Sequence, residues 1–529
     1  MSLQELINQA DPGSILEIPA GTYHEQIKIN KPLTLQGTDI VIIDGEGLEE
    51  KPMVHILSND VILQNLIIQN GPLFGIQIAN SATPELTGIV ITQNTIRKNT
   101  NTGIISTQQA AMTISDNLIS QNGQGSGFNR GGIGLFSHGP TTIINNIIDQ
   151  NALDGIFAQD SSTSLRIENN KITNHIISGI TLAWDQRNTQ IINNQISTCG
   201  SGLNDEQGGI VLIQALAEII KNNLLENCNF SGLFWGWVPS QGPIPTEILI
   251  ENNLIKNCSR DGIYLFSQGP GGFISPDLFP LEPLITNNTI NNNARAGVFV
   301  SNLYYYSPGN AKPTLLENKI VDNGWGAINN TSQIVEAPYN WWGSNSGPYH
   351  PELNPAGIGN PVSNNIDFIP WLTKTPVIEK CKISAITLEN YQTAPPTNNV
   401  YPLDLTFKIT GEIKLKINQV EKISTFAHWF TSRVNLASPL GDTLEPTIEY
   451  QGHCYGTLQN QSIQLEIEIG LWLLLQTRQS ILIPTFGPAH QNTKCAPPKP
   501  ISLNCIAANL IQDSYWIEKS LLHYLDLKP

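Results

Sequence analysis

Residues 143–156, IINNIIDQNALDGI, and residues 167–180, IENNKITNHIISGI, are two copies of one motif. The two copies share Ile, Asn, Ile, a polar residue, Gly and Ile at the same spacing, and they start 24 residues apart. Apolar residues separated by two or three positions, rather than by helical steps, indicate short strands. A motif of this length that repeats along the chain predicts a solenoid.

The motif recurs through the first two thirds of the chain, and each copy contains one anchoring asparagine. The steps between anchors are 29, 23, 29, 24, 24, 29, 30, 35 and 30 residues. We interpret the shortest steps as single coils of a β-helix with three strands each, and the longer steps as coils with inserted loops. The anchors are Asn65, Asn94, Asn117, Asn146, Asn170, Asn194, Asn223, Asn253, Asn288 and Asn318.

Two aliphatic columns accompany the anchors, one three residues before and one two residues after. Every member is Ile or Leu. We expect each column to stack along the axis at the strand spacing of ~4.8 Å and to fill the bore. The columns are Ile62, Ile91, Ile114, Ile143, Ile167, Ile191, Ile220, Ile250, Ile285 and Leu315, and Ile67, Ile96, Ile119, Ile148, Ile172, Ile196, Leu225, Ile255, Ile290 and Ile320.

A polar column lies five residues after each anchor. Its members are Asn70, Asn99, Asn122, Asn151, His175, Cys199, Cys228, Cys258, Asn293 and Asn323. Stacked asparagines can bond amide to amide from coil to coil. A metal or redox site is one interpretation of the three cysteines. We favour small buried hydrophobes, because thiolate ligands must converge on a metal rather than stand in a line.

The composition limits the partners of the chain. Acidic residues outnumber basic ones by 44 to 28, giving a net charge of −16. This charge repels nucleic acid and anionic membranes, so no nucleic-acid partner is expected. Residues 1–23 contain neither a basic start nor an apolar core, and no stretch is long enough to span a membrane, so we expect a soluble protein without a visible signal peptide. The sequence leaves the oligomeric state open, and also the compartment: extracellular or surface-bound if a signal was removed, otherwise cytoplasmic or spore-associated.

We expect three parts. Residues 1–13 form an N-terminal cap containing Leu3, Leu6 and Ile7, and residues 14–372 form the solenoid, whose far end Trp341, Trp342 and Trp371 close. Residues 376–529 form a smaller domain. Alternating apolar residues at 403–417, with a break or bulge at Gly411, and apolar runs at 462–476 and 480–486 predict an antiparallel β-sandwich there.

Three segments carry a family resemblance: IPAGTYHEQIKINKPLTLQG at 18–37, the asparagine repeats, and NWWG, NPAG and PWL between 340 and 372. Over residues 14 to about 372 the chain resembles the NosD-type right-handed parallel β-helix repeat proteins of the pectin-lyase-like superfamily. The resemblance implies an all-β solenoid. It does not imply one activity, because the superfamily includes lyases, glycosidases, epimerases, adhesins and structural spikes.

Aromatic residues gather at positions two and four after the turn glycines, which should face outward. An exposed aromatic row indicates a partner or covering loops, and flat rings stack on sugars. The outward positions include Phe136, Phe157, Gln159, Thr181, Phe234, Tyr264, Phe266 and Phe299, of which all but Gln159 and Thr181 are aromatic. The candidate substrate-binding residues are Trp184, Trp235, Trp237, Tyr264, Phe266 and Arg187.

Carboxylates in the same region supply candidate catalytic residues. Asp160 and Asp185 stand about one coil apart and are the candidate acid/base pair, with Glu206 as a substitute, because glycoside hydrolysis uses two carboxylates. Asp154 and Asp261 precede turn glycines, and we interpret them as turn residues. No metal site is expected, although a calcium ion would fit a uronic acid polymer as substrate.

The sequence therefore predicts a β-helix protein that binds carbohydrate or processes a polysaccharide. A processing enzyme would be a hydrolase, a lyase or an epimerase, and the sequence leaves the type open. The partner would be an oligo- or polysaccharide. The alternative is a non-catalytic structural protein of a cell or spore surface that uses the solenoid as a rigid scaffold.

Overall fold

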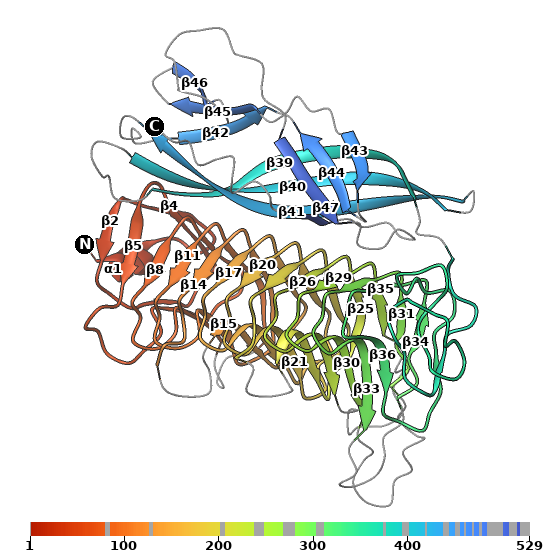
Figure 1. Cartoon of the computed structure of the whole chain (residues 1–529). Coiled ribbons are helices and arrows are strands. Elements are labelled where there is room, and N and C mark those ends of the chain that lie inside the picture. The colour runs from red at the N-terminus through yellow and green to blue at the C-terminus, as the bar shows by residue number, and fades with distance from the viewer. Residues whose placement is uncertain are drawn as a thin grey trace, which may run out of the picture. The chain divides into compact units, whose positions relative to one another are not determined.

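The structure is a computed structural model. It describes residues 2–373 except 80–84, 126–130, 202–206, 237–247, 268–280 and 303–310, together with the backbone of strands between residues 377 and 518. The chain divides into two compact units, residues 1–374 and 375–529. Figure 1 shows the first unit as a stack of coils.

Each coil up to β36 contributes one strand to each of three parallel sheets, as predicted for a β-helix, and β37 and β38 extend the first sheet alone. The first sheet consists of β1 (Ile15–Ile18), β4 (Leu33–Gly37), β7 (Val61–Gln64), β10 (Leu86–Thr92), β13 (Ala110–Ser115), β16 (Thr141–Ile144), β19 (Leu165–Glu168), β22 (Thr189–Ile192), β25 (Ala217–Lys221), β28 (Leu249–Glu251), β31 (Leu284–Thr286), β34 (Thr314–Leu316), β37 (Val335–Glu336) and β38 (Ile366–Asp367). The second sheet consists of β2 (Gly21–Tyr23), β5 (Val41–Asp44), β8 (Ile67–Gln69), β11 (Thr95–Arg97), β14 (Leu118–Ser120), β17 (Ile147–Asp149), β20 (Lys171–Thr173), β23 (Gln195–Ser197), β26 (Leu224–Glu226), β29 (Leu254–Lys256), β32 (Thr289–Asn291) and β35 (Lys319–Val321). The third sheet consists of β3 (Ile27–Ile29), β6 (Val54–Ile56), β9 (Ile76–Ile78), β12 (Ile104–Ser106), β15 (Gly131–Phe136), β18 (Asp154–Gln159), β21 (Ser178–Ala183), β24 (Gly208–Ile213), β27 (Ser231–Gly236), β30 (Asp261–Ser267), β33 (Ala296–Asn302) and β36 (Trp325–Asn329).

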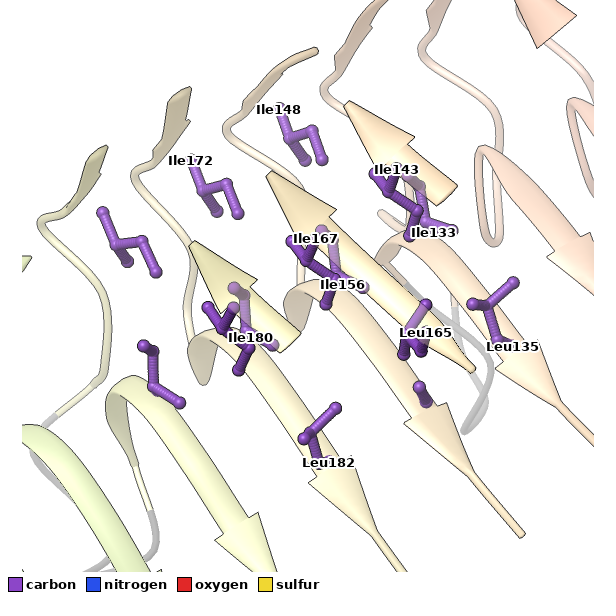
Figure 2. Packing of buried hydrophobic residues seen from close by; sticks show 14 of the residues in the cluster. Ile133, Leu135, Ile143, Ile148, Ile156, Leu165, Ile167, Ile172, Ile180 and Leu182 are labelled. Carbon is purple, nitrogen blue, oxygen red and sulfur yellow. The ribbon is translucent and has the colours of Figure 1, made fainter. Parts of the chain in front are cut away.

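Aliphatic side chains from all three sheets fill the bore. Figure 2 shows Ile143 and Ile167 from the first sheet, Ile148 and Ile172 from the second, and inward residues of the third in regular rows. From the second repeat onward, every member of both predicted columns is fully buried. This confirms the predicted columns over that range, and their burial is the main favourable term of the fold.

The first repeat is shifted by one residue relative to the prediction. Ile91 pairs with Leu63 rather than Ile62, and Ile96 pairs with Ile68 rather than Ile67. Leu66, not Asn65, occupies the anchor position, because its backbone N–H donates to Asn94 Oδ1 (3.0 Å). The assignment of Asn65, Ile62, Ile67 and Asn70 was therefore wrong: the sequence offered an asparagine beside a position that holds a leucine.

The anchor asparagines form an unbroken ladder from Asn94 to Asn340. At a typical rung, Asn170 donates through Nδ2 to Asn194 Oδ1 (3.0 Å) and to the carbonyl of Ile143 (2.9 Å). The same Asn194 Oδ1 also accepts the backbone N–H of Asn170 (2.9 Å). Each buried amide thus satisfies its own atoms and the backbone of the turn, as buried polar groups must.

The predicted polar column is a second, interrupted ladder. Asn99, Asn122 and Asn151 bond amide to amide, and Asn293 and Asn323 do so near the far end. Between these two stretches lie His175 and the cysteines Cys199, Cys228 and Cys258, which are free and buried. The structure confirms the prediction that these thiols are buried.

Both ends of the bore are covered. The helix α1 (Leu3–Gln9) buries Leu3 and Ile7 on the first coil, and a capping box between Ser2 and Glu5 starts it. At the other end Trp342 is fully buried in the core. Within the described residues, no helix is long and apolar enough to cross a membrane.

The second unit contains antiparallel sheets, described here by their backbone. The expected alternating segment lies in a 17-residue strand that pairs without interruption with its following neighbour. The bulge expected at Gly411 lies instead on the preceding strand, between Ile383 and Ala385, opposite Gly411 and Thr410. The three sheets are β39 (Val377–Thr393), β40 (Tyr401–Ile417) and β41 (Val420–Leu436); β42 (Leu444–Glu449), β45 (Gly470–Leu475) and β46 (Gln479–Ile483); and β43 (Tyr455–Gln459), β44 (Ser462–Ile467), β47 (Ile501–Ile506) and β48 (Trp516–Glu518).

His175 generates a prediction about acid stability. Burial lowers its pKa from 6.5 to about 4, although the carbonyls of Asn151 and Ile148 lie within hydrogen-bond distance of its ring nitrogens. The unfolded chain therefore takes up this proton first, and the folded state loses roughly 3 kcal/mol as pH falls from about 6.5 to about 4. His175→Asn restores the residue used at neighbouring rungs, so its denaturation midpoint should fall less between pH 7 and pH 4.5 than that of the parent.

The matched control is His24→Asn, at an exposed histidine, which should retain the acid sensitivity of the parent. Equal sensitivity in the parent and in His175→Asn would contradict the assignment.

Candidate functional site

The outer face of the third sheet carries the candidate site. Along β18 the side chains of Ile156 and Ala158 enter the bore, and those of Phe157 and Gln159 point outward. The neighbouring strands follow the same alternation because the register is continuous across the sheet. The main outward column is Gly134, Phe157, Thr181, Val211, Phe234, Tyr264, Phe299 and Ile328.

An accessible aromatic cluster, here called the Trp184 platform, is formed by Phe136, Phe157 and Trp184. The rings of Phe136 and Phe157 are 5.4 Å apart, and those of Phe157 and Trp184 are 6.0 Å apart, edge to face. The two phenylalanines are half-buried, whereas Trp184 is 50% exposed. Trp184 has a φ of 42° in the turn after β21, so the turn, rather than a strand, directs its ring outward.

Charged groups border the platform. Asp160 is exposed, and its backbone N–H donates to the carbonyl of Trp184 (3.0 Å). The partner of Asp160 on the next coil is thus Trp184, and Asp185 is one residue further along. The Asp185 carboxylate pairs with Arg187 (3.1 Å), and the Asp160 carboxylate accepts from Gln159 Nε2 (2.5 Å). The structure places the proposed acid/base pair in one neighbourhood, with no hydrogen bond between the two carboxylates.

A buried network holds the turn that carries Trp184. Gln186 is fully buried and donates through Nε2 to the carbonyl of Arg187 (3.1 Å) and to Thr189 Oγ1 (3.2 Å). The ring of His138, from the preceding coils, lies with Nδ1 2.6 Å from the carbonyl oxygen of Gly139 and with Nε2 3.1 Å from Gln186 Oε1, and the tautomer decides which nitrogen donates. Burial lowers the pKa of His138. The turn is therefore fixed from inside the solenoid, which keeps the platform in one orientation.

Asp154 is a buried acid on this same face that our sequence interpretation had assigned to the turn. Its Oδ1 accepts from Thr181 Oγ1 (2.7 Å), and Thr181 is the register partner of Phe157. Burial raises the pKa of Asp154 to about 7, against the smaller lowering by the Thr181 hydrogen bond. A carboxyl that exchanges its proton near neutral pH is suited to acid/base chemistry. The sequence indicated the unusual environment of Asp154 in one way only. An aspartate stands there at a register position that holds Gly, Ser or Ala in most strands of the third sheet from β15 to β33.

A second aromatic cluster lies further along the sheet and is closed. It contains Phe234, Tyr264, Phe266 and Phe299, and the rings of Tyr264 and Phe299 are 5.0 Å apart. Tyr264 and Phe266 are only 5% and 6% exposed, so neither presents a free ring face, and sugar binding by these two predicted residues stays untested.

An ion pair stabilises the closed cluster. Arg295 lies 3.7 Å over the ring of Phe299 and donates to both oxygens of the buried Asp261, at 2.8 Å through Nε. Asp261 therefore holds Arg295 in place. It begins β30 and binds a side chain of the next coil, so its role is structural but is not that of the turn residue expected from the sequence.

One other predicted residue, Trp235, does not join the platform. Trp235 is 0% exposed and packs in the bore, in register with Leu212 and Leu265. A ring inside the bore cannot stack on a sugar outside it, so the prediction that Trp235 binds sugar is wrong. Glu206 and Trp237 lie outside the described residues.

The described part of the chain contains no group of three or more His, Cys, Asp or Glu side chains able to hold a metal ion. Two acids on the outer face of the third sheet already pair with arginines: Asp185 pairs with Arg187, and Asp261 pairs with Arg295. A calcium-bridged substrate accordingly stays an expectation.

Several solved protein structures are similar to this chain. The A-module of a mannuronan C-5 epimerase from Azotobacter vinelandii is 15% identical, covers 62% of this chain and 90% of its own, and has a TM-score of 0.45. A periplasmic alginate epimerase is 13% identical, with 70% and 82% covered and a TM-score of 0.44. Pectate lyase Pel9A is 13% identical, with 62% and 72% covered and a TM-score of 0.35.

No curated protein sequence matches the chain. The family described as "Right handed beta helix region" matches residues 40–196, 132–275 and 246–336, which together span more than half of the chain. The chain belongs to this right-handed β-helix family.

The buried carboxyl of Asp154 should make stability depend on pH. Its pKa is raised from 3.8 to about 7, so the unfolded chain ionises first, and the folded state loses roughly 4 kcal/mol as pH rises from about 4 to about 7. Asp154→Asn keeps an oxygen for the Thr181 hydroxyl and removes the charge. Chemical denaturation should show a variant that is more stable than the parent at pH 8 and similar to it at pH 4.

Asp116→Asn, at an exposed aspartate, is the control and should change stability little at either pH. A gain for Asp154→Asn that is the same at pH 4 and pH 8 would show that the carboxyl is not held in its neutral form.

Proposed function

We propose that this protein binds an oligosaccharide on the outer face of the third sheet, with the Trp184 platform as the stacking surface. The single observation that carries the proposal is the half-exposed ring of Trp184, held edge to face by Phe157 on a turn that Gln186 fixes from below. An exposed indole that packs against two further rings on a fixed turn offers a flat apolar surface that a ligand can cover.

The polar groups around the ring suit a sugar. Hydroxyl groups both donate and accept, and the carboxylates of Asp160 and Asp185, the guanidinium of Arg187 and the amide of Gln159 provide partners of both kinds. The C–H faces of a pyranose ring are apolar and would cover the indole. The support for the proposal is thus one apolar surface bordered by donors and acceptors, the usual composition of a ligand site.

Catalysis is a separate step of the proposal. Asp160 and Asp185 remain the candidate pair, with Glu206 as a substitute, and Asp154 joins them as an acid able to donate a proton near pH 7. Asp154 begins β18 and Asp160 directly follows its last residue, about 20 Å away for an extended strand, too far for the two carboxylates of a glycosidase. Asp154 would therefore act without Asp160. The alternative of a non-catalytic scaffold predicts no glycan binding at this face.

Trp184→Ala should weaken glycan binding about tenfold, since it removes the stacking surface. The measurement is a glycan array of neutral and uronic oligosaccharides, followed by titration of the best binder and mass analysis of the products. The matched control is Trp325→Ala, which removes an exposed tryptophan at the last coil of the same sheet and should bind like the parent.

The outcomes separate the hypotheses. Binding without product would make this a binding protein, and product formation lost in Asp185→Ala with binding retained would make it an enzyme. Unchanged affinity in Trp184→Ala, or no binding of any glycan by the parent, would overturn the proposed site.

A further inference from the structure

A pocket lies on another part of the solenoid, at the turns that lead from the second sheet to the third. Its volume is about 640 Å³, within the usual range for small-molecule sites of ~300–1,000 Å³. Four consecutive coils contribute to it, through residues that follow β11, β14, β17 and β20. None of the Trp184 platform residues lines it, so it is distinct from the proposed glycan site.

The lining is polar and carries one charge. Lys98 is the cation, and among the described residues it makes no ion pair, while the lining includes neither Asp nor Glu. The net charge of the chain is −16, which disfavours anions at long range. A recess with one cation and no acid is therefore a local exception that can accept a single anionic group.

Hydrogen-bonding side chains from successive coils line the same pocket as Lys98. Gln121 donates through Nε2 to Gln150 Oε1 (3.3 Å). The Gln121 side-chain oxygen and the Gln150 amide hydrogens take no part in this bond, so they can bind a ligand. Thr100 and Gln124 add a hydroxyl and a further amide. Successive coils place such groups ~4.8 Å apart, and carboxamides can donate to and accept from a hydroxyl pair at once.

Apolar side chains complete the pocket. Ile176 is 53% exposed, and the buried Ala152 also lines the pocket. The position of Ile176 at the end of the amide row offers an apolar contact beside the hydrogen-bonding groups.

We propose that this pocket is a second ligand site, which binds a polyhydroxylated molecule carrying one anionic group. The anion would lie at Lys98, the hydroxyls along Gln121, Gln124 and Gln150, and a C–H face against Ile176. The proposal does not depend on the Trp184 platform, and the two can fail independently.

Three probes test the chemistry by saturation-transfer NMR titration: glucuronate, glucose and acetate. Glucuronate should bind more tightly than glucose, which lacks the charge, and more tightly than acetate, which lacks the hydroxyls. Lys98→Met keeps the length of the side chain and should weaken glucuronate binding roughly fivefold, the size expected for an exposed charge. Gln124→Ala should weaken glucuronate and glucose alike.

Two matched variants serve as controls. Lys28→Met removes an exposed lysine elsewhere on the solenoid and should bind glucuronate like the parent. Trp184→Ala should also retain this binding, which separates the pocket from the platform. Equal affinity for the three probes, no binding of any of them, or unchanged glucuronate affinity in both Lys98→Met and Gln124→Ala would overturn the proposal.

Discussion

The buried amide ladder from Asn94 to Asn340 is the constraint on which the rest of the structure depends. Each amide reaches the next coil at about 3 Å and also binds turn backbone, so one coil cannot slide past another without leaving buried polar groups unpaired. The aliphatic columns supply most of the favourable free energy, but hydrophobic contact is not directional. The ladder adds the direction and fixes the register.

A fixed register explains why a site can form on the third sheet at all. Residues far apart in the sequence, such as Phe136, Phe157 and Trp184, meet because they occupy successive coils at the same face. The same register brings Thr181 to Asp154 and Gln186 to His138. In each pair the partner comes from a different coil, so the electrostatic character of the face is a property of the stack rather than of any one coil.

The sequence predicted the parts of the fold that repeat. The isoleucine columns and the buried thiols follow from spacing alone, because every coil needs the same inward residues. The first repeat was assigned one residue out of register, since Leu66 and Gly71 stand where the following repeats carry asparagine. The inward position of Trp235 was also missed, because a bulky aromatic there takes the place of a leucine in neighbouring coils. The environment of Asp154 could not be predicted, since it comes from Thr181 on the next coil and from burial.

Amide hydrogen exchange in Asn194→Ala tests most directly whether the ladder fixes the coils. The substitution leaves the N–H of Asn170 and the carbonyl of Ile167 without their partner. Our account predicts faster exchange in the coils on both sides, including the turn at Trp184. The control is Gln190→Ala, which removes an outward amide from β22, the strand that precedes Asn194, and should change exchange only around residue 190. Faster exchange confined to the turn of residue 194, with the neighbouring coils as protected as in the parent, would contradict it.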